Sequence, residues 1–118
     1  MPEQKSIVEF TDECEDELFE SPVYGWSEIQ RIANANGVYL ITHGDDIVYI
    51  GESKNILNRF KKNHATGRNS AFRKNLKELD SLPDDFLSEC DIRYLVLEYG
   101  RKEVEEELIK RYKPLCNK

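Results

Sequence analysis

Two short apolar segments separated by a polar stretch constrain the fold more than any other feature of the sequence. Residues 38–42 and 47–50 are rich in β-branched and aromatic side chains, and the polar stretch 43–46 between them contains a glycine. This pattern predicts a β-hairpin. Because side chains alternate along a strand, Tyr39 and Tyr49 share one face only if paired residue numbers have an even sum. That register requires an odd number of loop residues, and the glycine favours a three-residue loop.

The remaining apolar patterns complete an α+β fold. Residues 92–97 are the most apolar segment with β-branched and aromatic side chains, which predicts the central strand of the sheet. Helical periodicity predicts helices at residues 27–35, at 55–64, from Ser70 onward and at 102–112. We therefore expect one domain with a three-stranded, mostly antiparallel sheet flanked by helices.

The charges are distributed unevenly along the chain. The net charge is −6, and residues 1–20 alone hold eight acids and one base. We expect an acidic arm over residues 1–22, with a short strand near residues 6–10, and a folded domain over residues 23–118. Two interpretations of the arm stay open: a disordered solubilising tail, or a segment that lies over the basic part of the chain and weakens binding there.

That basic part covers residues 53–77, which carry eight bases and no acid. A block of one sign in a folded domain is typical of a surface that binds the phosphate backbone of nucleic acid. The alternative is an ordinary solvated helix face. The side chains predicted to contact nucleic acid are Lys54, Lys61, Lys62, Arg68, Arg73 and Lys74.

Hydropathy and cysteine content constrain the location of the protein. No apolar run approaches the length of a membrane-spanning helix, and the acidic start does not resemble a secretion signal. Cys14, Cys90 and Cys116 lie far apart without a CxxC pair, which argues against a disulfide scaffold or a cysteine-based zinc site. We therefore expect a cytoplasmic protein with no membrane partner.

The last predicted helix carries a carboxylate within its apolar stripe, at Glu105. Its neighbours Glu106 and Glu107 each have a cation four residues on, Lys110 and Arg111 respectively, whereas Glu105 has none there. An inward carboxylate must be neutralised, paired or bound to a metal. One carboxylate together with water molecules suits Mg²⁺. An ion pair with a distant arginine is the alternative.

The helix predicted at residues 55–64 places two more polar side chains beside an apolar stripe. Arg59 lies at the edge of the stripe, and its planar guanidinium suits a phosphate group. His64 falls within the stripe at the helix end, where a partly buried histidine with ordinary hydrogen bonds is the alternative interpretation.

Read in order, four blocks of the chain resemble the GIY-YIG nuclease family. They are Gly37-Val38-Tyr39, Tyr49-Ile50-Gly51, residues 52–59 ending in Arg59, and residues 105–117, which begin with Glu105 and end with Asn117. The ordered set is more specific than any single block. The resemblance covers roughly residues 36–117 and implies metal-dependent hydrolysis of DNA phosphodiester bonds.

The resemblance also implies roles for particular residues. Glu105 would bind one divalent cation, Mg²⁺ or Mn²⁺. Tyr39 would act as general base or position a water, which requires a nearby cation because a free tyrosine has a pKa of about 10. Tyr49 would orient the phosphate or the attacking water, and Arg59 would stabilise the negative charge at phosphorus. The supporting catalytic residues implied by the resemblance are His64 and Asn117.

Two other functions stay open. One is a catalytically weak nucleic-acid-binding module of the same fold, and the other is a protein-interaction domain whose acidic character reflects a protein partner. We expect sequence specificity to come from this small domain, a homodimer or a partner protein, because no separate DNA-binding segment follows in the sequence.

Overall fold

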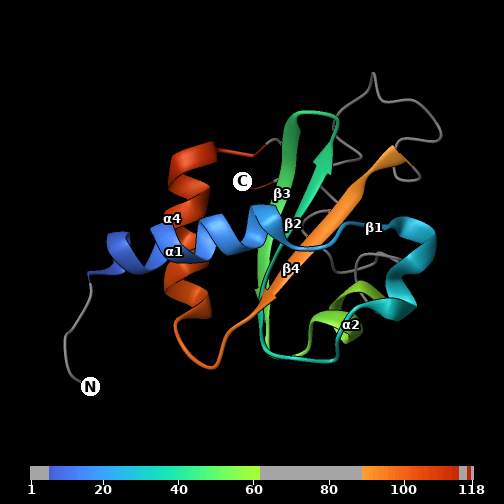
Figure 1. The fold of residues 1–118 in the computed structure, drawn as a ribbon, viewed down its shortest axis with the longest axis horizontal. Coiled ribbons are helices and arrows are strands. Elements are labelled where there is room, and N and C mark those ends of the chain that lie inside the picture. The colour runs from blue at the N-terminus through green and yellow to red at the C-terminus, as the bar shows by residue number, and fades with distance from the viewer. Residues whose placement is uncertain (1–5, 62–88, 115–116, 118) are drawn as a thin grey trace.

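In a computed structural model that describes residues 6–61, 89–114 and 117, helices cover both faces of an antiparallel sheet (Figure 1). The strand order is β1-β4-β2-β3. The elements are α1 (Ile7–Glu20), β1 (Tyr24–Gly25), the 3₁₀ helix η1 (Trp26–Arg31), β2 (Gly37–His43), β3 (Asp46–Ser53), α2 (Ile56–Arg59), β4 (Asp91–Val96) and α4 (Arg101–Tyr112).

The α+β fold is confirmed, with four strands where three were expected. The additional strand, β1, pairs Tyr24 with Ile92 and Gly25 with Asp91. Two residues are too short to produce an alternating hydrophobic pattern, so the sequence gives no strand signal there. β4 lies between β1 and β2, as expected for the most apolar segment, and β2 is the second interior strand.

The hairpin register confirms that the two tyrosines share a face, although the predicted loop is wrong. Tyr39 pairs with Gly51 and Ile41 with Tyr49, so the paired numbers have an even sum along this part of the hairpin. At the turn His43 pairs with Asp46, which leaves a two-residue loop with a glycine at φ +61°. A β-bulge inserts Val48 and changes the parity between the two regions.

The helices differ from expectation mainly in length. The helix predicted at residues 27–35 is the shorter η1, and the predicted helix at 55–64 begins with α2, while its end lies outside the described residues. The helix predicted from Ser70 also lies outside the described residues. The last helix is confirmed; it ends at Tyr112, and its C-cap residue, Lys113, has a left-handed φ of +46°. None of the helices in the described ranges has the length and apolar character needed to cross a bilayer.

Alternating residues of β2 contribute their side chains to two separate hydrophobic cores. Tyr39 and Ile41 belong to the cluster beneath η1 and α2, whereas Val38 and Leu40 belong to the cluster beneath α1 and α4. In Figure 1, α4 runs alongside β3 on the side of the molecule opposite α2. The second core therefore fixes α4 against the edge of the sheet.

The N-terminal segment is a packed helix, so both the expected strand at residues 6–10 and the disordered tail are wrong for the described residues. The hydroxyl of Ser6 caps α1 by accepting a hydrogen bond from Glu9 N–H at 3.1 Å. Cys14 and Leu18 are buried in the core that α1 shares with α4. The pattern was obscured by the density of acidic residues on the exposed face of the helix. A boundary between residues 22 and 23 stays a prediction.

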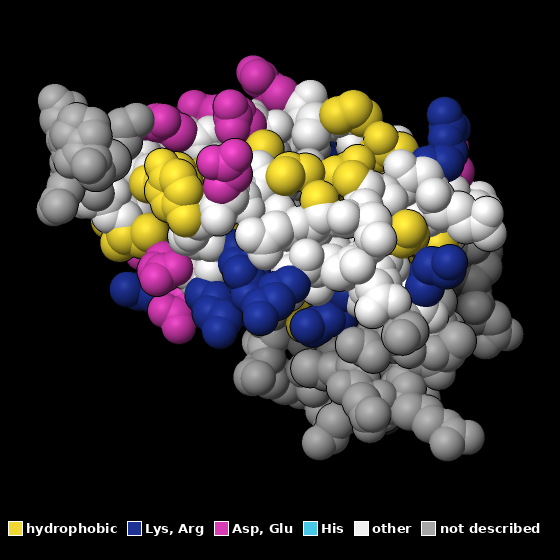
Figure 2. Space-filling view, turned by 90° about the horizontal axis from the view of Figure 1, so that it is seen from below, with side chains coloured by type: hydrophobic (Ala, Val, Ile, Leu, Met, Phe, Trp, Pro, Cys, Tyr) yellow, Lys and Arg dark blue, Asp and Glu magenta, His cyan; other side chains and the backbone are white. Residues whose placement is uncertain are grey.

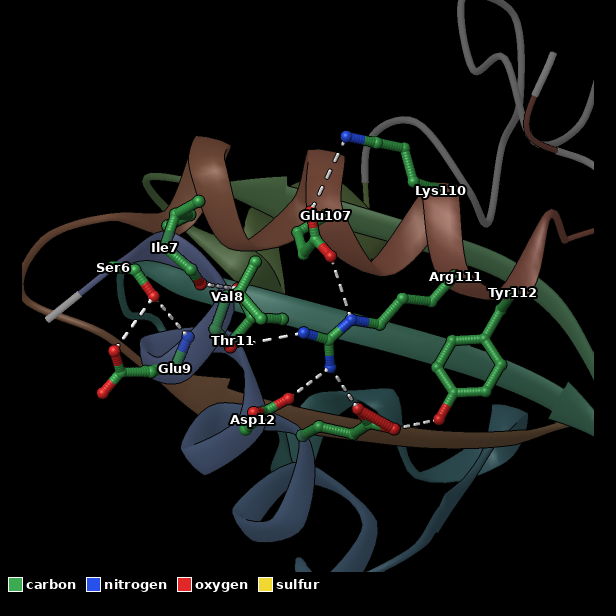
Figure 3. A network of polar contacts seen from close by, with 11 residues as sticks. Ser6, Ile7, Val8, Glu9, Thr11, Asp12, Glu107, Lys110, Arg111 and Tyr112 are labelled. Atoms are coloured by element: carbon green, nitrogen blue, oxygen red, sulfur yellow. Dashed lines mark hydrogen bonds and ion pairs between the residues drawn. The ribbon is translucent and has the colours of Figure 1, made fainter.

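Arg111 of α4 forms ion pairs that hold α1 against α4 (Figure 3). Its Nη1 lies 2.7 Å from Glu15 and 2.9 Å from Asp12, and its Nε donates to Glu107 at 3.1 Å. The Tyr112 hydroxyl also hydrogen-bonds Glu15. Two acids of α1, Asp12 and Glu15, therefore pair with α4 rather than with residues 54–61, the described part of the basic segment.

Replacing Arg111 with alanine should destabilise the domain, because three carboxylates lose their shared counter-charge at a partly buried interface. We expect a loss of about 2–3 kcal/mol in the free energy of unfolding, measured by urea denaturation. The matched control is Arg31→Ala, since Arg31 is 71% exposed and its ion pair within the described residues is with Glu28. The loss of stability from this substitution should stay below about 0.5 kcal/mol. Equal effects of the two substitutions would show that the Arg111 network contributes nothing.

Candidate active site

The free edge of β3 positions the site. β3 is the last strand of the sheet, so among the described residues its outer backbone groups face no strand. Asn117 occupies part of this edge: Ile50 N–H donates to Asn117 Oδ1 at 2.8 Å, and Asn117 Nδ2 donates to the Ile50 carbonyl at 2.8 Å. Two residues further on, the N–H of Glu52 hydrogen-bonds the Glu105 carboxylate. Two side chains that follow β4 in sequence therefore take the place of a neighbouring strand.

Gly51 lies between these two edge contacts and leaves room for a phenol. A Cβ built on Gly51 would overlap the ring and hydroxyl of Tyr39. The absence of a side chain at this position therefore allows the Tyr39 hydroxyl to lie directly against the backbone of the edge strand. Gly37 has a similar role in the first motif, because a Cβ there would overlap the Leu95 carbonyl of β4.

The two tyrosines lie together on the α2 side of the sheet. Their ring centroids are 6.2 Å apart, and Phe60 packs edge-on against Tyr39 at 4.9 Å. Tyr39 is fully buried, whereas Tyr49 keeps 8% of its surface exposed. Burial first, and then Tyr49, raises the pKa of Tyr39 well above its ordinary value of 10, while Arg59 lowers it. Without a further cation, Tyr39 is a neutral phenol.

Glu105, on α4, lies close enough to Tyr39 and Arg59 to interact with them electrostatically. Its neighbours Val104 and Leu108 are buried, as the helical stripe predicted, and Glu105 itself is half-buried. Burial first, and then the charge of Glu52, raises the pKa of Glu105 from 4.5 to about 7, with Arg59 acting in the opposite direction. Within the described ranges Glu105 has no ion pair, so its negative charge is poorly compensated.

The other two glutamates of this helix differ in their partners. Glu107 pairs with Arg111 as predicted. Lys110, the expected partner of Glu106, instead lies 3.9 Å from Glu107. The predicted pairing of Glu106 with Lys110 was therefore wrong, because Lys110 lies nearest the carboxylate three residues before it rather than four.

Arg59 is positioned by the capped start of α2. The Asn55 side chain accepts a hydrogen bond from Asn58 N–H at 3.0 Å, and the Ser53 hydroxyl in turn accepts from Asn55 N–H at 3.0 Å. Arg59 opens onto a shallow groove of about 530 Å³ between α2 and α4. The groove is lined by Glu52, Ser53, Lys54, Asn55, Asn58, Arg59, Arg101 and Lys102.

An ion pair between Glu52 and Arg101 is the feature that sequence reasoning missed. Arg101 Nε donates to Glu52 Oε1 at 2.7 Å, and both side chains are mostly buried. Glu52 immediately follows Gly51, but its partner lies 49 residues further along the chain. No local spacing rule connects the two positions, so only the packing of α4 beside β3 brings them together.

The other predicted site residues divide into two groups. Lys54 and Lys61 are exposed, and Lys54 alone of these two lines the groove. A larger open hollow of about 750 Å³ near the hairpin turn includes none of the predicted site residues. The predicted residues that lie outside the described part of the chain are His64, Lys62, Arg68, Arg73 and Lys74.

The donor set at Glu105 fits a hydrated divalent cation. Across the described ranges no three His, Cys, Asp or Glu side chains converge into a full metal cage. A single desolvated carboxylate beside a second one provides hard oxygen donors and excess negative charge, which suits Mg²⁺ because that ion keeps several of its waters. Glu105 would be the ligand, and Glu52 adds to the negative potential.

Comparisons with known proteins find the same family as the motifs. A model described as the GIY-YIG catalytic domain matches residues 35–118. The chain is 30% identical over 90 residues to the UvrABC system protein C of Fusobacterium nucleatum subsp. nucleatum. That match covers 73% of this chain and 13% of the relative, so the chain spans only a small part of the relative's length.

Solved structures of the GIY-YIG N-terminal endonuclease domain of UvrC from Thermotoga maritima share the fold. The domain bound to its catalytic divalent cation, magnesium, has a TM-score of 0.54 and 21% identity, covering 78% of this chain and 93% of that chain. A point mutant bound to its catalytic divalent cation has a TM-score of 0.57 and 21% identity, covering 78% and 92% respectively. At this identity the likeness establishes the fold.

Replacing Glu105 with glutamine should stabilise the metal-free domain, and more so at high pH. A carboxyl whose pKa is raised in the folded state stabilises below its unfolded pKa of 4.5, and that contribution is lost as the pH rises through about 7. At pH 8 we expect Glu105→Gln to gain about 1–2 kcal/mol in the free energy of unfolding, allowing for partial solvent screening. Urea denaturation in EDTA measures this.

The gain should nearly vanish at pH 4.5, where the wild-type carboxyl is protonated in the folded state. The exposed Glu103 of the same helix provides the control, since Glu103→Gln should have little effect at either pH. A gain for Glu105→Gln that is equal at both pH values would contradict the account of this carboxylate.

Gly51→Ala should displace the Tyr39 ring and reduce the stability of the domain by about 1–3 kcal/mol, since the added methyl overlaps the phenol in a packed core. Gly25→Ala is the matched control, because its nearest atom is Glu28 Oε1 at 3.5 Å, an ordinary contact. Thermal unfolding compares the two variants. A Gly51→Ala protein as stable as Gly25→Ala would show that this close approach is unimportant.

Proposed function

The chain belongs to the GIY-YIG family, and from this premise we propose that it is a metal-dependent endonuclease that hydrolyses DNA phosphodiester bonds at a single-metal site. Residues 35–118 are the catalytic domain of that family. The observation that carries the proposal is Glu105, a half-buried carboxylate that no described cation pairs with and that interacts electrostatically with the Tyr39 phenol and the Arg59 guanidinium. A purely structural domain has no need to retain a charge in this position.

Glu105 would hold Mg²⁺ or Mn²⁺, with water filling the other coordination positions. When bound, the ion would supply electrostatic stabilisation for the leaving 3′ oxygen, so that no separate general acid is required. The comparison structures bound to a catalytic divalent cation support this assignment.

The phenols and the guanidinium would position the reacting groups. Arg59 borders the open groove and would donate hydrogen bonds to phosphate oxygens, which stabilises negative charge as it grows at phosphorus. Tyr49, the more exposed phenol, would orient the phosphate or the attacking water. Tyr39 is neutral in the metal-free protein, so it would donate a hydrogen bond to the water, and act as a base only beside a cation.

Asn117 would act as a positioning residue rather than a catalytic one. Both of its amide hydrogen bonds go to the backbone of Ile50, next to Tyr49 and Gly51. These two hydrogen bonds would hold the edge strand in position, and with it the adjacent Tyr49. His64 remains a proposed member of the site from the motif resemblance alone.

A catalytically weak nucleic-acid-binding module is the second candidate. The cationic groove that Arg59 borders favours nucleic-acid binding for both candidates, so a binding measurement alone does not distinguish them. With one site per chain, we propose that the protein nicks one strand, and that a break in both strands requires sequential action, a homodimer or a partner protein. The two described cysteines, Cys14 and Cys90, are buried thiols, which fits the reducing cytoplasm that we propose as the location of the protein.

Incubation of the full chain with supercoiled plasmid and Mg²⁺ tests the proposal. We expect conversion to the nicked circle, abolished by EDTA and reduced at least about 100-fold by Glu105→Gln, because the substitution removes the metal ligand. Glu103→Gln makes the same chemical change at an exposed position of the same helix and should nick like the wild type.

Equal nicking by the wild type and Glu105→Gln would indicate a contaminant or a wrong ligand assignment. DNA binding without cutting across Mg²⁺, Mn²⁺ and several DNA forms would favour the weak binding module. A protein with neither binding nor cutting would exclude both candidates.

A further inference from the structure

The groove beside the candidate metal corner concentrates positive charge in an acidic chain. Four of its lining residues are cations and one is a carboxylate, whereas the whole chain has a net charge of −6. The groove is lined by the end of β3, by α2 and by the first turn of α4, and these segments lie at the lower end of the molecule in Figure 1. Figure 2 views the molecule from below and shows Lys and Arg side chains gathered in a compact cluster on this face.

The four cations come from three different elements. Lys54 follows β3, Arg59 ends α2, and Arg101 and Lys102 begin α4. Lys54 and Lys102 are exposed and have no ion pair within the described ranges. Charges spread over several elements along an open groove suit an extended polyanion better than a single small phosphate, because each cation meets a different phosphate.

Arg101 and Lys102 also lie close to the candidate metal ligand. They precede Glu105 by four and three residues on α4, which is about 6 and 4.5 Å along the helix axis. Residues four apart share a helix face, so Arg101 projects on the same side as Glu105. A DNA strand bound along Arg101 and Lys102 would therefore also pass Glu105, the candidate metal ligand.

The ion pair with Glu52 prepares Arg101 for such a contact. A bond from Nε at 2.7 Å fixes the guanidinium plane, while its two terminal amino groups have no ion-pair partner within the described ranges. Terminal groups held in this way are suited to a phosphate, since Arg presents a planar fork of donors. Glu52 therefore reduces the conformational entropy that Arg101 loses on binding.

We propose that Arg101 and Lys102, together with Lys54, bind backbone phosphates of the DNA strand next to the cleaved bond, and that Glu52 orients Arg101 for this contact. The inference rests on the proposed function and extends it to residues outside the family's four motif blocks. In this proposal α4 has two roles: its first turn binds the DNA strand, and its second turn carries the candidate metal ligand, Glu105.

Binding of a fluorescein-labelled 30-bp duplex, measured by anisotropy in EDTA over a range of salt concentrations, tests the inference without the metal or the reaction. We expect Arg101→Ala/Lys102→Ala to raise the Kd about tenfold and to reduce the slope of log K against log salt by about two, because two phosphate contacts are lost. Lys102→Glu alone should give a similar loss of affinity, and because Lys102 is exposed, this variant should fold normally.

Lys110→Glu provides the matched control. Lys110 is an exposed lysine on the same helix, about 12 Å along the axis from Lys102, and its substitution changes the net charge by the same amount as each test variant. We expect its Kd to stay within about twofold of the wild type and its salt slope to be unchanged. A uniform effect of net charge would instead weaken all three variants equally and overturn the inference.

The outcomes separate this inference from the proposed function. A wild type that nicks plasmid, with test variants that bind like Lys110→Glu, would refute the roles of Arg101 and Lys102 and leave the nuclease intact. A wild type that neither binds the duplex nor nicks plasmid would refute the proposed function and this inference with it. Selective loss of binding in the test variants supports the inference even if the wild type proves catalytically weak.

Discussion

The outer edge of β3, which pairs with no other strand in the described part of the chain, is the constraint on which the rest of the structure depends. An edge strand presents backbone donors and acceptors that need partners, and here Asn117 and Glu105 supply them at Ile50 and Glu52. These contacts draw α4 and the C-terminal residues against the strand that carries Tyr49 and Gly51. Hydrogen bonding to the backbone groups at the β3 edge therefore brings together residues that lie more than fifty positions apart in the sequence.

The same arrangement explains why the corner is suited to metal chemistry. Tyr39 belongs to the core on one face of the sheet, and Glu105 lies on the helix that packs on the other. The Tyr39 hydroxyl lies close to the edge strand because Gly51 has no side chain there, and Glu105 is near enough to act on its pKa. The carboxylate is desolvated by packing and placed beside Glu52, so the folded protein holds a concentration of negative charge that a cation would relieve. The ion pairs of Arg111 with Glu107 and with α1 fix the position of α4, and so the position of Glu105.

Local sequence patterns predicted the parts of this arrangement that depend on periodicity. The helical stripe of α4 placed Glu105 inward, and the alternation in the hairpin placed Tyr39 and Tyr49 on one face. The loop itself was wrong because a bulge at Val48 cannot be seen in an alternating pattern. The Glu52–Arg101 pair and the packing of α1 on α4 depend on contacts between distant segments, which no spacing rule reports.

The central claim is that Glu105 holds a divalent cation, and diffraction from crystals of the protein grown with Mn²⁺ tests it most directly. We expect one strong anomalous peak about 2–2.5 Å from a Glu105 carboxylate oxygen, with water molecules as most of the remaining ligands. An anomalous map with no peak at Glu105, or a structure in which that carboxylate is paired with a lysine or arginine, would contradict the claim.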